Sequence, residues 1–387
     1  MSKSRRAIKN SHLPANALKN YIARCKSDSK SSQNHITGEL VVKKLRILIT
    51  TIGGLTSSDL IYALRKNKER EVELFGLDAF EWAVCKTMVD HFCICPNSTE
   101  DEEIFANFVN NYARQNAIDI IIPCGNEDNL ALAKYKEKFQ TPILVGSYNS
   151  LIKAYDKGAV YDFLRDRLPQ HAPKFKIVKN LQEFQEALAF LNFPQNKIVI
   201  KPRFGRGGRG VYIIGNCFNF DNFFHKKPEN EVDIKTIEAI LKQQENFEEL
   251  IVMEYLTSPF LSAYSLCYQG KNILTLKHIR EWGNASQTYR GLVSYDEDME
   301  KLCSKVIEIF NLTYTNNMEL AFNQNGNIVL FDLNPRIGAS SAIDTDIGFN
   351  FPYLAIKLLL QEEIKINKEL LPTQSRFLRY FSYLWLK

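Results

Sequence analysis

The chain has 387 residues, of which 45% are hydrophobic and 24% charged, and its formal net charge is +5. This length is enough for two or three domains that each bury a core. The sequence contains no uninterrupted apolar run of about 18 residues, and its N-terminus lacks the apolar stretch of a signal peptide. We therefore expect a globular, cytoplasmic protein without a membrane span.

The positive charge is concentrated at the N-terminus. Residues 1–40 carry eight lysines and arginines against two acidic residues, a net charge of +6, so the rest of the chain is about neutral. The composition predicts a disordered basic tail over residues 1–43, and contact with an anionic surface is the alternative. A neutral body gives no reason to expect a nucleic-acid partner.

The eight cysteines are scattered, mostly inside apolar stretches, and we interpret them as small buried hydrophobic residues. Zinc binding by Cys93, Cys95 and the nearby His91 is the alternative. No second pair of closely spaced cysteines completes such a site, which argues against it.

The first predicted domain, residues 44–150, alternates short apolar strands with helices. Strands are predicted at 45–50, 72–77, 92–95 and 118–122, and helices at 102–115 and from a cap at Ser57 or Ser58 to Arg65. This rhythm indicates a doubly wound parallel sheet. The Gly53-Gly54 turn lacks the three spaced glycines of a dinucleotide site, so we do not expect a nucleotide there.

Beyond residue 155 the strands follow one another through shorter turns, which indicates an α+β arrangement dominated by antiparallel sheet. We expect a small domain at 155–256 and a C-terminal domain at 257–387. The predicted strands are 174–178, 197–201, 210–214, 250–256, 263–268, 273–281, 318–323 and 328–333, and the predicted helices are 181–191 and 297–310.

A glycine-rich loop joins two of these strands. It reads Lys201-Pro202-Arg203-Phe204-Gly205-Arg206-Gly207-Gly208-Arg209-Gly210. Closely spaced glycines leave backbone N–H groups free to surround an anion, and the arginines add positive charge. A solvated hairpin is the alternative from these residues alone.

Carboxylates gather on two later strands. Glu319 lies on one, and the other ends with Asp332 and Asn334. Strand alternation should place Asp332, Asn334 and Leu330 on one face of the sheet. Two carboxylates and an amide are hard oxygen ligands of the kind that Mg²⁺ prefers, although acidic residues on a surface are the more common explanation of such a pair.

Taken in order, these motifs resemble the ATP-grasp superfamily, in particular the branch of biotin carboxylase and the carbamoyl-phosphate synthetase large subunit. The resemblance extends over about residues 45–360. It rests on Lys157, Lys201, the 206–210 loop, the segment Val252-Met253-Glu254-Tyr255-Leu256, Glu319 and the run Asp332-Leu333-Asn334-Pro335-Arg336.

The resemblance implies a role for each motif. Lys157 and Lys201 would contact the phosphates of ATP, and the loop with Arg206, Gly207 and Gly208 would close over them. The adenine would be read at Glu254, Tyr255 and Leu256, largely by backbone groups. Glu319, Asp332 and Asn334 would hold Mg²⁺, with Mn²⁺ as the alternative ion. Arg336 would steady the phosphoryl or acyl-phosphate group.

Further candidates lie near the acceptor. Arg280 and Arg290 stand where related chains place basic residues, so we assign Arg280 to the catalytic set and leave Arg290 open between substrate binding and the strand surface. Glu127, at the carboxyl end of a parallel strand, is interpreted either as an amine ligand or as the cap of a helix at 129–139.

One stretch departs from the family pattern. Related chains have Gly-x-Glu-Tyr-Ser-x-Asp after the hinge, whereas this chain has Ala263 and Cys267 at the two acidic positions. A ribose or metal-proximal contact could therefore be missing.

The resemblance implies an ATP-dependent ligase that activates a carboxylate as an acyl phosphate for attack by an amine or another nucleophile. Its substrates would be small molecules, and a homodimer is compatible with the sequence. A small-molecule kinase and a non-catalytic nucleotide-binding regulator are the alternatives. Ala263 and Cys267 argue mildly for the regulator, whereas the intact set Glu319, Asp332, Asn334 and Arg336 argues against it.

Overall fold

A computed structural model describes residues 44–205, 207–215, 230–283, 287–340 and 342–380. The predicted basic tail at 1–43 and Arg206 lie outside these residues. In the part of the chain that is described, none of the helices is both long and apolar enough to cross a membrane.

The first sheet is parallel, as the alternation of strands and helices predicts. Its four strands lie in the order β3-β2-β1-β4, so the carboxyl ends of all four strands meet at one edge. The strands are β1 (Leu45–Thr50), β2 (Val72–Asp78), β3 (His91–Ile94) and β4 (Ile120–Pro123). The accompanying helices are α2 (Leu55–Arg65), α3 (Glu102–Gln115), η1 (Lys136–Lys138), α4 (Asn126–Lys134) and α5 (Tyr148–Tyr155).

Two helices of this domain begin earlier than we predicted. α2 begins at Leu55 with Gly54 as its N-cap, and the Ser57 hydroxyl donates to Thr51 O instead of capping the helix. α4 begins at Asn126, so Glu127 lies in its first turn and is not its cap. Both helices start directly after a glycine that ends a strand-to-helix turn, which side-chain capping preferences do not reveal.

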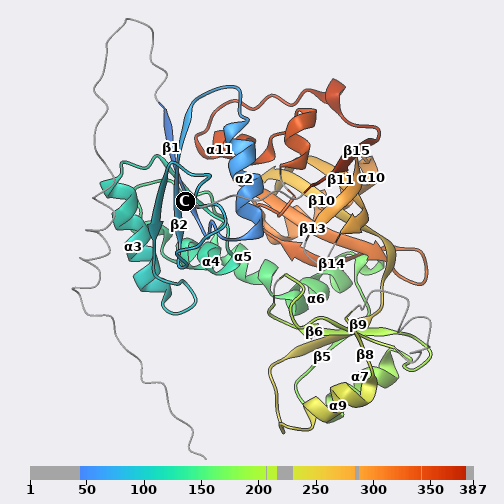
Figure 1. Cartoon of the computed structure of the whole chain (residues 1–387). Helices are drawn as coiled ribbons and strands as arrows, with labels where there is room; N and C mark the ends of the chain where they lie inside the picture. The colour runs from blue at the N-terminus through green and yellow to red at the C-terminus, as the bar shows by residue number, and fades with distance from the viewer. Residues whose placement is uncertain (1–43, 206, 216–229, 284–286, 341, 381–387) are drawn as a thin grey trace, which may run out of the picture.

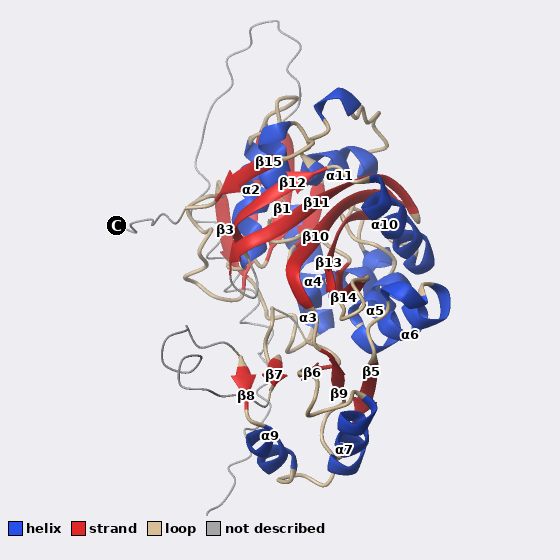
Figure 2. Cartoon of the chain, turned by 90° about the vertical axis from the view of Figure 1, so that its right-hand side faces the viewer, coloured by secondary structure: helices blue, strands red, loops and turns tan. Residues whose placement is uncertain are grey.

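The second sheet belongs to a small domain that lies below the others in Figures 1 and 2. Its strand order is β5-β9-β6-β7-β8, and all but the last pair are antiparallel. The strands are β5 (Phe175–Val178), β6 (Ile198–Pro202), β7 (Tyr212–Ile214), β8 (Glu231–Val232) and β9 (Leu250–Glu254). The helices are α6 (Lys157–Arg167), η2 (Pro169–His171), α7 (Leu181–Phe190) and α9 (Ile234–Leu241).

The third sheet has six antiparallel strands in the order β14-β13-β10-β11-β12-β15. Its strands are β10 (Thr257–Tyr268), β11 (Lys271–Gly283), β12 (Thr288–Ser294), β13 (Tyr314–Phe322), β14 (Ile328–Asn334) and β15 (Ser375–Leu378). The helices are α10 (Glu297–Phe310), η3 (Ile343–Ile347), α11 (Phe351–Leu359) and η4 (Lys368–Leu370). The sequence did not predict β8, β12 or β15.

The two faces of the third sheet have different partners. α10 and α6 pack on one face through a continuous apolar cluster, while α11 and the first domain share a cluster with the other face. Figure 2 shows α10 and α11 beside the long strands, with the small domain at the far end. The face shared with the first domain carries Tyr264 and Ser262, and Ser262 is in register with the carboxylates of β13 and β14.

A bulge in β14 overturns part of the predicted alternation. Glu319 pairs with Asp332, but its neighbour Leu320 pairs with Leu330, so Phe331 is an extra residue on β14. Directly paired residues share a face of the sheet. Asp332 and Asn334 therefore face the same side as predicted, whereas Leu330 lies on the opposite, apolar side because the bulge reverses the alternation.

Candidate functional site

Lys157 is placed by the start of α6. The Asp156 carboxylate caps this helix by accepting from the backbone N–H groups of Gly158 and Ala159. From the next position Lys157 extends its ammonium to 2.9 Å from Asp332 Oδ1 and donates a 2.8 Å hydrogen bond to Gly205 O. This one side chain therefore contacts both the glycine-rich loop and the metal-ligand strand.

Lys201 approaches the same strand from β6. Its side chain is only 5% exposed, and Nζ donates to Tyr161 OH at 2.7 Å and to Phe331 O at 3.0 Å. Phe331 is the bulged residue, and Tyr161 OH donates to its carbonyl as well. Burial lowers the pKa of Lys201 to about 7, with Asp332 opposing the shift and Lys157 adding to it.

The glycine-rich loop connects β6 to β7. Gly207, Gly208 and Gly210 have φ angles of 61°, 70° and 69°, in the left-handed region that L residues seldom adopt. At the base of the loop Arg203 forms two contacts of 2.7 and 2.6 Å with the Asp156 carboxylate. The loop is thus anchored to the N-terminus of α6, and its predicted member Arg206 lies outside the described residues.

The three predicted metal ligands come together on one face of the third sheet. Glu319 and Asp332 are register partners on β13 and β14, and Asn334 Nδ2 donates to Asp332 Oδ2 at 2.9 Å. Glu319 also accepts from Ser262 Oγ at 2.8 Å and from Asn317 Nδ2 at 2.7 Å. Neither of these last two residues was singled out by the sequence.

The two carboxylates differ in electrostatic environment. Burial pushes the pKa of Asp332 up, but Lys157 and Lys201 outweigh it and hold the pKa below its usual value. Burial raises the pKa of Glu319, with Arg280 as the main opposing charge. Asp332 is therefore the carboxylate held in its charged form, chiefly by Lys157.

Arg280 and Arg336 flank the carboxylates on opposite sides. Arg280 Nη2 lies 3.6 Å from Glu319 Oε2. Arg336 follows β14 and reaches the first domain, where its Nε donates to Asn126 Oδ1 at the start of α4. Its Nη2 also lies 3.4 Å from Asn334 Oδ1. Arg336 therefore links the metal-ligand strand to the carboxyl edge of the parallel sheet.

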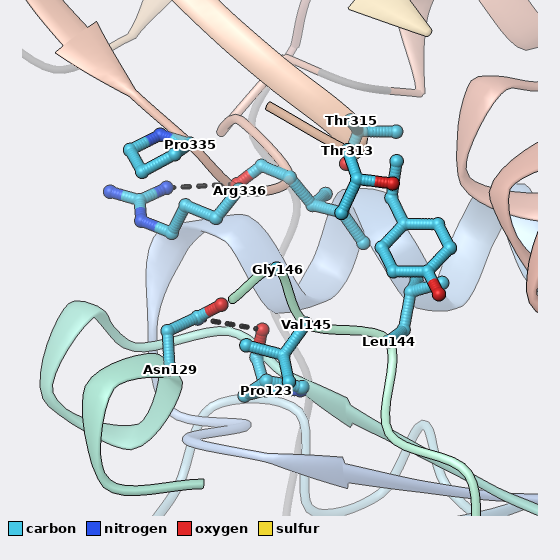
Figure 3. Close-up of a pocket in the computed structure, with 11 residues that line it drawn as sticks. Pro123, Asn129, Leu144, Val145, Gly146, Thr313, Thr315, Pro335 and Arg336 are labelled. Atoms are coloured by element: carbon cyan, nitrogen blue, oxygen red, sulfur yellow. Dashed lines mark hydrogen bonds between the residues drawn. The ribbon is translucent and has the colours of Figure 1, made fainter. Parts of the chain in front are cut away.

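A small cavity beside Arg336 marks this junction between domains. Figure 3 shows Pro335 and Arg336 facing Pro123, Asn129 and Val145 of the first domain across it. The space is about the size of one water molecule. It is too small for a substrate, and its lining residues show that it lies where the two domains meet.

The predicted hinge lies between the second and third sheets. Glu254 ends β9, and its Oε1 accepts from the backbone N–H of Lys174 at 2.8 Å. Tyr255 and the buried Leu256 then lead into β10. The Glu254 carboxylate is thus engaged by the protein's own backbone, and adenine recognition at residues 254–256 stays a prediction.

The structure separates two further candidates from the central group. Arg290 lies on β12 with Nε 3.2 Å from Glu281 Oε2, and its side chain is half exposed. Glu127 lies in the first turn of α4, next to the residue that Arg336 contacts. Only Glu127 is near the group that contains Arg336.

Ala263 and Cys267 do not belong to the site. Both are fully buried in the apolar cluster formed with α10, on the side of the sheet opposite Glu319. Ser262 instead occupies the site face and contacts Glu319. An acidic side chain at Ala263 or Cys267 would enter the core, so these residues leave no gap among the metal ligands and do not favour the regulator.

The zinc alternative at Cys93 and Cys95 and the magnesium candidate at Asp332 differ in the side chains around them. His91 Nε2 lies 2.8 Å from Glu73 Oε1, and no three His, Cys, Asp or Glu side chains gather into a metal cluster within the described residues. The geometry thus adds nothing to the zinc alternative at Cys93 and Cys95. The magnesium candidate instead combines two carboxylates with the amide oxygen of Asn334.

A parallel α/β domain, a small antiparallel domain with a glycine-rich loop and a larger antiparallel sheet with the carboxylates together form the ATP-grasp fold. Residues 246–378 match the model of the family described as ATP-grasp in the biosynthetic pathway with Ter operon.

Solved structures share this fold across most of their length. N5-carboxyaminoimidazole synthetase from Staphylococcus aureus, complexed with ADP, is 16% identical with a TM-score of 0.60, covering 84% of this chain and 79% of that one. L-amino acid ligase from Bacillus licheniformis is 15% identical with a TM-score of 0.58, covering 82% and 74%. The biotin carboxylase domain of 2-oxoglutarate carboxylase from Hydrogenobacter thermophilus, a dimer with MgADP and bicarbonate, is 14% identical with a TM-score of 0.60, covering 86% and 73%.

Proposed function

We propose that this protein is an ATP-dependent ligase that activates a small carboxylate as an acyl phosphate and transfers the acyl group to an amine or another nucleophile. The observation that carries the proposal is the convergence of Lys157 and Lys201 on β14, whose Asp332 is the register partner of Glu319. The similar structures are a synthetase complexed with ADP, a ligase, and a biotin carboxylase domain complexed with MgADP.

The residues fit Mg²⁺ and a nucleotide. Lys157 is free to exchange the Gly205 carbonyl for a phosphate oxygen, because both are acceptors of an ammonium hydrogen bond. The three positive-φ glycines give the loop a backbone that can approach phosphates closely. Asp332, Glu319 and Asn334 offer oxygen ligands on one face, and Mn²⁺ accepts the same ligands.

In this proposal the domains built on the three sheets have different roles. We treat residues 44–150 as the acceptor domain, 155–256 as a lid that carries Lys201 and the glycine-rich loop, and 257–387 as the domain with the metal ligands. The nucleotide would lie between the lid and the site face of the third sheet. Arg336 would then stand between the nucleotide and the first domain, because it contacts Asn334 and Asn126.

Charge stabilisation by fixed groups is the chemistry that these residues can perform. In the first step a carboxylate oxygen of the substrate attacks the γ-phosphorus, the bond to the bridging oxygen of ADP breaks, and ADP leaves. Asp332, Glu319 and Asn334 would hold Mg²⁺, which would supply positive charge beside the phosphates. Lys157 and Lys201 stabilise the equatorial oxygens, and Arg336 offers paired N–H donors to the acyl phosphate.

In the second step the nucleophile attacks the acyl carbon. A new bond to carbon forms, the carbon to oxygen bond of the acyl phosphate breaks, and inorganic phosphate leaves. An amine nucleophile releases its proton to solvent. The product would be an amide, and the L-amino acid ligase among the similar structures is consistent with this class of product.

Trapping with hydroxylamine tests the proposal. The full chain should be incubated with Mg²⁺-ATP, hydroxylamine and a panel of amino acids and small carboxylates. We expect a hydroxamate and one ADP per turnover with the right acid. Asp332→Asn serves as the inactive control.

Other outcomes would replace the proposal. AMP with pyrophosphate would indicate an adenylate intermediate. A stable phosphoester without hydroxamate would indicate a kinase, and tight ATP binding without consumption across the panel would indicate a regulator.

A further inference from the structure

Arg379 lies directly after β15, and its side chain joins separate parts of the chain. Its backbone N–H donates to Tyr289 O at 2.7 Å, which continues the pairing of β15 with β12. Its Nη1 donates to Ala339 O at 3.0 Å and lies 3.4 Å from Ser340 Oγ, and its Nη2 donates to the Asp59 carboxylate on α2. One guanidinium group therefore connects the end of β15, the segment that follows β14 and the first domain.

The segment of residues 337–340 packs on the site face of the third sheet and is also held by Arg379. Gly338 lies against Tyr264, since a Cβ added to this glycine would lie 2.5 Å from Tyr264 Cε1. Tyr264 is on β10 two residues after Ser262, so both side chains share the site face. The Arg379 guanidinium binds the two residues that follow Gly338. The segment is thus fixed by the sheet at one residue and by Arg379 at the next two.

The orientation of Arg336 depends on the same segment. Arg336 Nη1 donates to Ile337 O at 2.8 Å, two residues before the carbonyl that Arg379 binds. It also contacts Asn126 and Asn334. A shift of this backbone would therefore move the carbonyl that orients the Arg336 guanidinium. A misplacement of about 1 Å in a group that acts in a reaction can lower the rate about 100-fold.

The partner of Arg379 in the first domain is a buried charge. The Asp59 side chain is 9% exposed, and burial raises the pKa of its carboxyl group to about 6, with Arg379 opposing the rise. At neutral pH Asp59 is therefore ionised beside the guanidinium. A buried ion pair adds little to stability compared with apolar residues of the same size, because both charges lose their hydration. It does fix direction, since the planar guanidinium must align its donors with the carboxylate and the Ala339 carbonyl together.

We propose that Arg379 is a positioning residue of the ligase: by fixing residues 337–340 to α2, it holds the Arg336 guanidinium in the orientation that meets the acyl phosphate. This inference rests on the proposed function. It adds to the mechanism a residue that touches neither nucleotide nor substrate and acts through Arg336.

Two arginine-to-lysine substitutions give a matched pair. Arg379→Lys keeps a positive charge for Asp59, but a single ammonium group lacks the planar fork that meets two acceptors at once. Arg376→Lys makes the same change on β15, where the guanidinium contacts Glu281 Oε2 at 2.8 Å and the side chain is 56% exposed. We expect both variants to keep the wild-type circular dichroism spectrum.

Kinetics with the acid identified by hydroxamate trapping give the first test. Arg379→Lys should lower kcat for hydroxamate formation at least tenfold while the KM for ATP stays within twofold, because Arg336 acts after the nucleotide has bound. Arg376→Lys should keep both constants at their wild-type values. An unchanged kcat in Arg379→Lys, or an equal loss in both variants, would overturn the inference.

A double-mutant cycle shows whether Arg379 acts through Arg336. Arg336→Lys alone should lose most turnover, and adding Arg379→Lys should lower kcat by less than twofold more, because the guanidinium that Arg379 positions is already gone. Losses that multiply would show that Arg379 acts independently and would refute the proposed role. If Arg379→Lys does not fold, the cycle uses Asp59→Asn combined with Arg379→Gln, which leaves no unpaired buried charge.

Hydrogen exchange separates failure of this inference from failure of the ligase function. In the ligand-free full chain, Arg379→Lys should speed amide exchange at residues 336–340 at least tenfold and leave α3 and α10 unchanged, whereas Arg376→Lys should have no effect on this segment. Equal exchange at 336–340 in wild type and Arg379→Lys would refute the inference whether or not any acid yields a hydroxamate. Faster exchange in that variant, with no hydroxamate from wild type and any acid of the panel, would refute the ligase function and with it the role of Arg379 in the reaction.

Discussion

Replacing Lys201 with methionine should stabilise the ligand-free protein near neutral pH while weakening ATP binding. Burial lowers the pKa of this lysine from 10.5 to about 7. At pH 8 the folded side chain is mostly neutral and the unfolded one is charged, so folding bears a cost of about 3 kcal/mol. Methionine removes that cost and retains the length of the side chain.

The lost hydrogen bonds oppose this gain. Lys201 donates to Tyr161 OH and Phe331 O, but the Tyr161 hydroxyl keeps Phe331 O as its acceptor. No buried donor is left unpaired there, so we put the loss at about 1 kcal/mol. The net gain in the free energy of unfolding is about 2 kcal/mol, which corresponds to about 3 °C in Tm for a chain of this length.

The pH dependence of the difference in stability shows whether the buried charge of Lys201 is its cause. Between pH 7 and 10.5 the unfolded lysine binds a proton that the folded one has released, so wild-type stability rises with pH across this range. The variant lacks this contribution, so its advantage should be largest at and below pH 7 and be lost by about pH 10, where only the missing hydrogen bonds of Lys201 still count. Urea denaturation of both proteins at several pH values measures the difference, and Lys153→Met, at an exposed position of α5, is the control. A difference that does not change with pH would refute the argument.

Three further predictions concern the site. Asp332→Asn and Glu319→Gln should each abolish ADP formation and leave the circular dichroism spectrum unchanged, whereas activity equal to wild type would remove that residue from the metal site. Arg336→Lys should keep ATP affinity within twofold by calorimetry but lose most turnover, because a point charge lacks the two-pronged geometry; a normal rate would exclude it from the mechanism. Ala263→Glu, which restores the usual acidic residue, should destabilise the protein by about 3–5 kcal/mol in urea without improving ATP affinity, since it buries an unpaired carboxylate.

The sequence predicted the architecture because long periodic elements dominate it. α3 and α10 have the bounds that their apolar spacing indicates, and the parallel first sheet follows from its alternation of strands and helices. The convergence of Lys157 and Asp332 was implied only by the resemblance, since 175 positions of chain separate them in sequence and no local pattern encodes the contact. The contact of Ser262 with Glu319 could not be predicted from a local pattern either, because the two residues lie on different strands.

What the sequence could not predict depends on single-residue irregularities. The bulge at Phe331 reverses the facing of Leu330 and directs a carbonyl oxygen at Lys201, and no composition signal marks it. We compared Ala263 with the acidic residues of related chains. Strand alternation places Ala263 on the face opposite Ser262, which is the core face, but the sequence alone does not show which face carries the site.

The ion pair between Lys157 and Asp332 has a consequence for the order in which ligands are accepted. The predicted phosphate lysine and the predicted metal carboxylate neutralise each other at 2.9 Å. Magnesium must compete with Lys157 for the carboxylate, and phosphate must compete with Asp332 for the ammonium. The ligand that binds first breaks the ion pair and so frees the side chain that the second ligand binds. The affinities for magnesium and for phosphate are therefore linked, and each ligand must strengthen the binding of the other by the same factor. With Mg²⁺ and nucleotide bound as we propose, the closed ion pair would discriminate against free nucleotide and free metal in favour of the Mg²⁺-nucleotide complex.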